Sequence, residues 1–483
     1  MSRAKELAKS SASILASQVV IASSSFIFLT YFARVFSKQE MALYAFVTML
    51  SGWNQLLAGL GLGTLAAKDV PYMLASNQEQ KAKSLITSVV VYRMYSVALI
   101  ALVFFALAGA LTKLSFGSVQ YAGIVRLLVL ISFIMSVRAT FSEVQVALQR
   151  FQTRAFLTAA TNLGQRIFCV FGFLLFGLYG FFMGFLLATI IGAIFTYLDV
   201  HKYLCRQVLP FREVFKQSRS YMGLDLMRGA LDQVDRPIVA FFIGAETLAV
   251  YYIAKRIFDY SRIGMQAIVL PMGLKFGEAQ AEGWNSLNKY FKNSIAMTAA
   301  FFIPLGFFLI IVSKPLILLY ATQKYASSVP IAMAFGFTIM MAAMWNVCRL
   351  AGLRLLAAKD LMYQYIASSS VTFLGYAVLL PIIGAMGAPI AVGIGYLAGI
   401  FPIVYQLQKK CSLEMPAKEI LFALIGGLSL LSLAIPAWFI NNLVTKLVMI
   451  MLCSCLMYLG WVWILGPPQA RFILNKVLSK LHL

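Results

Sequence analysis

Residues 84–106 of the chain read SLITSVVVYRMYSVALIALVFFA. The stretch is apolar over about 20 residues, which is the length a helix needs to cross the hydrocarbon core of a bilayer. One arginine, Arg93, lies near its middle. Because an ionised group at that depth is costly unless it is paired or hydrated, the stretch predicts a membrane-spanning helix and a polar site beside it.

Similar apolar runs recur along all 483 residues, of which 61% are hydrophobic and 12% are charged. Ordinary soluble domains contain about 25% charged residues. We count about fourteen runs of spanning length, and no connection between them is long enough for a folded soluble domain. The predicted fold class is all-α, a polytopic membrane protein with about fourteen transmembrane helices.

Basic residues are distributed unevenly among the predicted connections. When the N-terminus and every second connection are placed on one side, that side holds 25 of the 40 Lys and Arg residues, the other side holds 6, and the helices hold 9. Positive charge is retained on the cytoplasmic side of membrane proteins, so both termini are expected in the cytoplasm. The charge is dispersed among short connections, which argues against nucleic-acid binding.

A short internal repeat indicates two related halves. Residues 40–44, EMALY, recur as residues 247–251, TLAVY, six predicted helices later. An even offset inserts both halves in the same direction, so they would be related by a pseudo-two-fold axis along the membrane normal. The predicted domains are an N-terminal six-helix bundle (1–200), a C-terminal six-helix bundle (201–410), and two extra transmembrane helices with a short cytoplasmic tail (411–483).

Two neighbouring predicted helices, 221–244 and 250–274, carry nine charged residues between them. These residues are Asp225, Arg228, Asp232, Asp235, Arg236, Lys255, Arg256, Asp259 and Arg262. Helical periodicity places most of them on one face of each helix. Such faces would either line a hydrated cavity or join the two helices through buried ion pairs.

The first half of the chain favours the cavity. Its predicted helices contain Arg93, Arg126, Arg138 and Arg166 but one clear acid, Glu143. Excess positive charge inside a bundle needs an anionic counter-ion, and the planar guanidinium binds phosphate through two hydrogen bonds. The predicted substrate-binding residues are Arg93, Arg138, Arg166, Arg228, Lys255 and Arg262.

Ion coupling requires a group whose charge can change, and no histidine falls within a predicted helix. A carboxylate that moves between water and a low-dielectric site can gain or lose a proton. The predicted coupling residues are Glu143, Asp232, Asp235 and Asp259. These carboxylates would alternatively be fixed to neighbouring arginines, and sodium coupling through carboxylates and helix carbonyls is a further alternative.

No other chemistry is predicted. The cysteine spacing does not suit a metal site, and the glycine run Gly59–Gly63 lacks the Gly-Lys-Ser/Thr ending of a phosphate-binding loop. We therefore expect no catalytic residue, no metal and no cofactor.

The basic N-terminal segment, the repeated junction at residues 40–44 and 247–251, and the glycine run Gly59–Gly63 resemble those of bacterial polysaccharide flippases. These are the O-antigen and repeat-unit translocases of the multidrug/oligosaccharidyl-lipid/polysaccharide exporter superfamily. The resemblance implies twelve core helices in two bundles around a central cavity, often with two further helices, and alternating access driven by a H+ or Na+ gradient. It implies that an undecaprenyl-diphosphate-linked oligosaccharide moves from the cytoplasmic to the outer leaflet of the inner membrane, for lipopolysaccharide or other surface polysaccharide.

The partners expected on that basis are the lipid-linked oligosaccharide, membrane lipids and the polysaccharide polymerase machinery. Two other functions fit parts of the pattern. A cation-coupled multidrug exporter would share the layout, although surplus arginine does not suit a cavity for cationic drugs. A membrane glycan polymerase or ligase would be expected to need a larger exported connection than any seen here. We therefore expect a transporter and not an enzyme.

Overall fold

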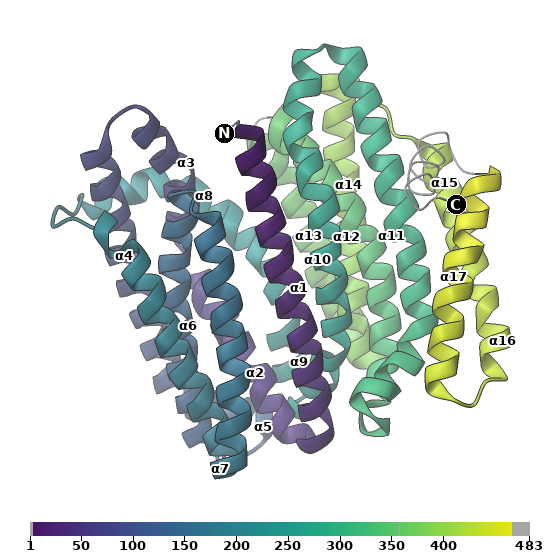
Figure 1. Ribbon diagram of the computed structural model, residues 1–483, viewed down its shortest axis with the longest axis horizontal. Coiled ribbons are helices and arrows are strands. Elements are labelled where there is room, and N and C mark those ends of the chain that lie inside the picture. The colour runs from purple at the N-terminus through teal and green to yellow at the C-terminus, as the bar shows by residue number, and fades with distance from the viewer. Residues whose placement is uncertain (1–2, 357, 466–483) are drawn as a thin grey trace. The chain divides into compact units, whose positions relative to one another are not determined.

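The computed structural model describes residues 3–356 and 358–465, which form helices joined by short turns (Figure 1). Nine segments of this described part are long and apolar enough to cross a membrane. Two of them contain 53 residues each, more than twice the length of one crossing. The predicted all-helical, polytopic fold is confirmed, whereas the count of fourteen spans stays a prediction. The predicted cytoplasmic tail beyond residue 465 lies outside the described residues.

The chain divides into two compact units, Met1–Ala249 (the first unit) and Val250–Leu483 (the second unit). The helices of the first unit are α1 (Arg3–Val35), α2 (Lys38–Leu57), α3 (Leu62–Ala75), α4 (Glu79–Ala106), α5 (Ala108–Phe116), α6 (Ala122–Ala147), α7 (Phe151–Val200), η1 (His201–Tyr203), α8 (Phe211–Gln233) and α9 (Asp235–Phe242). Helix α6 packs against α2, α4 and α7, and α8 packs against α2, α3 and α4. The predicted three-part division at residues 200 and 410 stays a prediction.

A break between α2 and α3 makes room for α8. Leu60 (φ 48°) and Gly61 (φ 70°) both adopt left-handed backbone conformations there. A Cβ atom on Gly61 would lie 2.5 Å from the backbone nitrogen of Met222 and 2.5 Å from the carbonyl oxygen of Ser218. Glycine is therefore required both for the turn and for the close approach of the two backbones.

Helix α7 is a hairpin of two antiparallel helices. Its direction reverses at Phe176 and Gly177, whose backbone angles are not helical. The two arms are in contact at glycines on either side of the reversal. A Cβ atom on Gly172 would overlap the carbonyl oxygen of Gly180. Small residues at such crossings let helix backbones pack closely in a membrane.

The second unit repeats this arrangement. Its helices are α10 (Ala245–Ala281, which begins just before the unit boundary), α11 (Trp284–Ala321), η2 (Gln323–Tyr325), α12 (Ser328–Leu355), α13 (Ala358–Ile383), η3 (Gly384–Met386), α14 (Gly387–Cys411), α15 (Ala417–Ser429), η4 (Leu430–Leu433), α16 (Ala434–Trp438) and α17 (Leu443–Leu465). Helices α13 and α14 form a second hairpin, and α12 packs against α11 and α14. The two copies of the sequence repeat lie at the starts of α2 and α10.

Candidate functional site

The first unit contains a partly open cavity of about 540 Å³ among α2, α3, α4, α6 and α8. That volume falls within the range of small-ligand sites. Its charged lining residues are Arg93, Glu143, Asp225, Arg228 and Asp232. The cavity therefore gathers five ionisable side chains among five helices, of which α4 and α6 are long and apolar enough to span a membrane.

The glycine run between α2 and α3 shapes this cavity. Gly61 accommodates the backbone of α8, and Gly59 and Gly63 line the cavity wall. A Cβ atom on Gly63 would overlap the carboxylate of Glu143. The run separates α2 from α3 and creates the space that an acidic side chain occupies.

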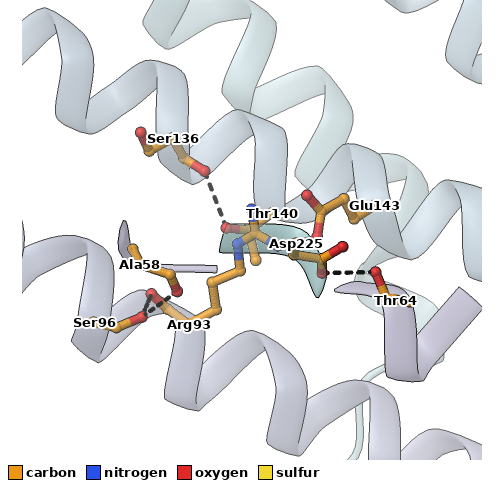
Figure 2. Close-up of polar contacts among 8 residues, drawn as sticks. All are labelled: Ala58, Thr64, Arg93, Ser96, Ser136, Thr140, Glu143 and Asp225. Atoms are coloured by element: carbon orange, nitrogen blue, oxygen red, sulfur yellow. Dashed lines mark hydrogen bonds and ion pairs between the residues drawn. The ribbon is translucent and has the colours of Figure 1, made fainter. Parts of the chain in front are cut away.

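Arg93 and Glu143 form an ion pair between α4 and α6. The Arg93 side chain is 4% exposed, whereas the Glu143 side chain is 36% exposed and lines the cavity. Figure 2 shows the two residues together with Asp225 and Thr64. Removing one member of a buried pair leaves an uncompensated charge, so the arginine depends on this carboxylate for its neutralisation.

Helix α8 is attached to α2 and α3 by three side-chain hydrogen bonds. Thr64 donates to the Asp225 carboxylate at 2.8 Å (Figure 2), and Lys68 donates to the Tyr221 hydroxyl at 2.7 Å. The Trp53 indole nitrogen donates to the carbonyl oxygen of Gln233 at 3.2 Å. These bonds hold the acidic stripe of α8 against the wall of the cavity.

The cavity contains three carboxylates and two guanidinium groups, so its charge is close to balanced. It brings together two predicted substrate residues, Arg93 and Arg228, and two predicted coupling residues, Glu143 and Asp232. Asp225 belongs to the same helical stripe as Arg228 but was not singled out from the sequence. We did not anticipate its link to Thr64, because Thr64 lies in what was expected to be a connection.

Three other predicted residues of the first unit do not line this cavity. Arg138 lies on α6, and Arg166 on α7 donates a hydrogen bond to the Ser24 hydroxyl of α1. Asp235 is buried at the start of α9, where its carboxylate accepts a hydrogen bond from the Arg236 backbone at 2.9 Å. These side chains are therefore distributed around the bundle and not gathered at one point.

The remaining predicted residues lie on α10 in the second unit. Lys255 is buried, with its ammonium 6.0 Å from the centre of the Tyr251 ring. Asp259 lies 3.7 Å from the guanidinium of Arg256, one turn earlier on the same helix. Arg262 is half-buried on the next turn. This ion pair lies within α10, and it matches the alternative in which a coupling carboxylate is fixed to a neighbouring arginine.

Arg154 was missed by the sequence reasoning, which placed it in a cytoplasmic connection. Helix α7 begins earlier than expected, at Phe151, so Arg154 stands in its first turn. Its Nε atom donates to the Ser142 hydroxyl of α6 at 3.0 Å. The available signal was the spacing of Arg154, Thr158, Asn162 and Arg166, which repeats every four residues along one helical face.

A family model described as polysaccharide biosynthesis protein matches residues 31–330. No curated protein matches the chain. Among solved structures, the lipid II flippase MurJ in an inward closed conformation is 15% identical, with 91% of this chain and 98% of that chain covered and a TM-score of 0.70. An outward-facing multidrug resistance MATE family transporter of the MOP superfamily is 14% identical, with 84% and 96% covered and a TM-score of 0.62. A MOP superfamily transporter from Pyrococcus furiosus is 14% identical, with 84% and 96% covered and a TM-score of 0.58.

At these identities the solved structures establish the fold, which is that of a flippase and of transporters. The predicted family and the predicted fold are both confirmed. The expectation of a transporter and not an enzyme agrees with them.

Proposed function

Since the chain belongs to the polysaccharide biosynthesis protein family, we propose that it is a flippase for an anionic, lipid-linked oligosaccharide. The cargo would pass from the cytoplasmic to the outer leaflet of a bacterial inner membrane, for surface polysaccharide such as O-antigen. The likeness in fold to a lipid II flippase supports this class of cargo. Coupling to an ion gradient, cytoplasmic termini and a polymerase partner belong to the same proposal.

The observation that carries the proposal is the Arg93–Glu143 ion pair, whose arginine is buried and whose carboxylate lines the cavity. Arg93 stands near the middle of α4, with about 20 Å of helix on either side at a rise of 1.5 Å per residue. Ionisable groups placed inside membrane helices are costly and mark the paths of substrates or ions. A purely structural bundle would not need five ionisable residues around an open volume of about 540 Å³.

We assign the cavity to coupling and not to the anionic cargo, because it holds more carboxylates than guanidinium groups. Glu143 is reachable from the cavity and neutralises a buried arginine. A proton or Na+ that binds to Glu143 weakens this ion pair, so loading of the cation and the packing of α4 against α6 are energetically linked. Asp225 and Asp232 provide further carboxylate oxygens at the same cavity.

The anionic headgroup is assigned to the arginines outside this cavity. In the first unit these include Arg138 on α6 and Arg166 on α7. Lys255 and Arg262 would have the same role in the second unit. Thr158 and Asn162, on the face that leads to Arg166, offer hydroxyl and amide groups suited to sugars.

The test compares surface polysaccharide and lipid-linked oligosaccharide in cells that lack the chain and in cells that express variants of it. Without the chain, the lipid-linked oligosaccharide should accumulate in the cytoplasmic leaflet. Glu143→Gln should fail to restore export at normal protein levels, whereas Glu213→Gln should restore it, because Glu213 is exposed at the start of α8. Normal export by Glu143→Gln would overturn the coupling assignment.

A second function, cation-coupled multidrug export, is favoured by one observation, the excess of carboxylates over guanidinium groups in the cavity. The MATE transporters that share the fold are described as multidrug transporters. Cells that lack the chain would then show normal surface polysaccharide and altered resistance to cationic dyes. That result would replace the flippase proposal.

A further inference from the structure

We propose that Arg138 and Arg154, here called the arginine pair, form a binding site for a diphosphate that is esterified at both ends, as in a lipid-linked sugar. The site deepens the proposed function, on which its cargo rests, by locating the group that the transporter would grip. Neither arginine of the pair lines the cavity.

The pair is assembled by the tight connection between α6 and α7. Helix α6 ends at Ala147 and α7 begins at Phe151, so the first turn of α7 returns alongside the last turns of α6. Ser142 lies one helical turn after Arg138, on the same face of α6. The hydrogen bond of 3.0 Å from Arg154 Nε to Ser142 Oγ therefore holds the Arg154 guanidinium close to Arg138.

Neither member of the pair is neutralised by an ion pair with a carboxylate of the described residues. The charged group that acts on Arg138 is Arg154, a second cation. Glu143 attracts Arg154 from a distance, but its carboxylate is held by Arg93. Within the described part of the chain, neither arginine of the pair forms an ion pair with a carboxylate. Two adjacent cations without a counter-ion are suited to receive an external anion.

Hydrogen bonding at Arg138 also indicates an anionic ligand. The Nε atom of Arg138 is buried and has no hydrogen-bond partner among the described residues. A buried donor without a partner is unfavourable, so an oxyanion that accepts from Arg138 would remove that cost. Arg138 is partly buried and Arg154 is exposed, which leaves the pair open to a ligand on one side.

The charge and shape of the pair select the chemical class of ligand. Two guanidinium forks can bind the oxygens of two phosphoryl groups, each through paired hydrogen bonds. A diphosphate that is esterified at both ends carries two negative charges, one on each phosphoryl group, whereas the phosphodiester of an ordinary phospholipid carries one. Thr158 and Asn162 continue the face of Arg154 at successive turns of α7, where the first sugar attached to a diphosphate would lie.

The site can be tested with inorganic pyrophosphate as the probe. The full chain in phosphatidylcholine nanodiscs should bind pyrophosphate in calorimetry. Arg138→Gln and Arg154→Gln should each weaken binding by about tenfold or more, the effect of losing a charge-assisted hydrogen bond. Arg154→Lys should have an intermediate effect, because it keeps the charge and loses the fork.

The matched control is Arg126→Gln, on the same helix, which removes a guanidinium that lies 5.8 Å from the Phe105 ring. It should bind pyrophosphate as the unmodified chain does. In addition, pyrophosphate should protect Arg138 and Arg154 from phenylglyoxal and leave Arg126 reactive. Unchanged pyrophosphate affinity in both Arg138→Gln and Arg154→Gln would overturn the site.

Two further measurements are needed. One distinguishes a diphosphate from a phospholipid headgroup as the ligand, and the other tests the proposed function independently of the site. If phosphatidylglycerol in the nanodiscs suppresses pyrophosphate binding, the pair is a phospholipid headgroup site and the diphosphate assignment is wrong. If cells without the chain export glycan normally, the proposed function fails, while the pyrophosphate measurements still decide the site. Loss of export in the two arginine variants, with normal export in Arg126→Gln, would support both proposals together.

Discussion

The two 53-residue hairpins of this chain, Phe151–Tyr203 in the first unit and Lys359–Cys411 in the second, share one plan but are closed differently. Each reverses at a glycine with φ 60°, Gly177 in one and Gly384 in the other. Each has glycines where its two arms cross. The hairpins differ at their open ends, where the ion pairs have opposite polarity.

In the first hairpin the base precedes the acid, because Arg150 at the start pairs with Asp199 at the end. In the second the acid comes first, because Asp360 near the start pairs with Lys410 near the end at 2.7 Å. An ion pair thus links the open end of each hairpin, with opposite polarity in the two. Each pair is called a latch below.

The segments that follow the hairpins differ in the same way. After the first, backbone nitrogens of Cys205 and Leu209 are held by the hydroxyls of Thr87 and Ser88 on α4, at 2.9 and 2.7 Å. After the second, Glu414 is held by Lys292 of α11 through an ion pair. The backbone nitrogen of Glu414 also donates to the Asn288 side chain of α11 at 3.0 Å, so a neutral attachment in one unit corresponds to a partly ionic attachment in the other.

The largest expected effect is at the glycine crossing of the first hairpin. Gly172→Ala should destabilise the chain by about 2 kcal/mol or more, because the new methyl group meets the backbone of Gly180, which cannot move aside. Gly164→Ala on the same helix has open space around it and should be neutral or stabilising by up to about 1 kcal/mol. Thermal unfolding in detergent measures both. Equal midpoints for the two variants would show that the arms are not in backbone contact.

The next effect should distinguish the two latches. Asp199 accepts two hydrogen bonds from Arg150 and one of 2.9 Å from Gln145, so Asp199→Asn should cost about 2 kcal/mol. Asp360 accepts one bond from Lys410, so Asp360→Asn should cost about 1 kcal/mol. A polarity swap, Arg150→Asp with Asp199→Arg, should recover part of the loss seen in Arg150→Asp alone. If the double variant is no better than the single one, the polarity of the latch is constrained after all.

A smaller effect is expected at the neutral attachment. Thr87→Val should cost about 1 kcal/mol, because it leaves the backbone nitrogen of Cys205 without its acceptor. The cost should not change between pH 4 and pH 6, because the bond joins two uncharged groups. Ser132→Ala is the control, since that buried hydroxyl bonds only to the carbonyl of Val129 in its own helix. A larger loss for Ser132→Ala than for Thr87→Val would contradict the role given to the attachment.

The smallest effect is expected at the ionic attachment, and it depends on pH. The hydrogen bond and the charge of Lys292 hold the pKa of Glu414 below its ordinary value. A lowered folded pKa means that the stabilisation is present above the unfolded pKa of about 4.3 and is lost as the pH falls through the folded pKa. Lys292→Gln should therefore lower the unfolding midpoint at pH 7 and match the unmodified chain at the lowest pH. Because the pair is exposed, added salt should reduce the difference; an equal midpoint difference at all pH values would rule out the ionic attachment.

Individual residues show how far the sequence reasoning reached. Arg93 and Glu143 were correctly expected inside membrane helices, and the structure adds that they form a pair. Arg154 was placed in a connection, because the start of a helix after a tight turn has no strong signal when its first residues are polar. The Asp225–Thr64 contact joins α8 to α3, segments more than a hundred residues apart, and no local pattern reports such a contact.

The sequence by itself determined the class of fold, because backbone groups in a membrane must be satisfied within each helix and spanning helices must therefore appear as long apolar runs. It also determined that these helices contain charged residues, since each arginine and carboxylate can be read directly. Only the tertiary structure decided which charges meet. The partner of a side chain depends on the rotation, depth and neighbours of its helix, and here these set Arg93 against Glu143 and left Arg138 beside Arg154.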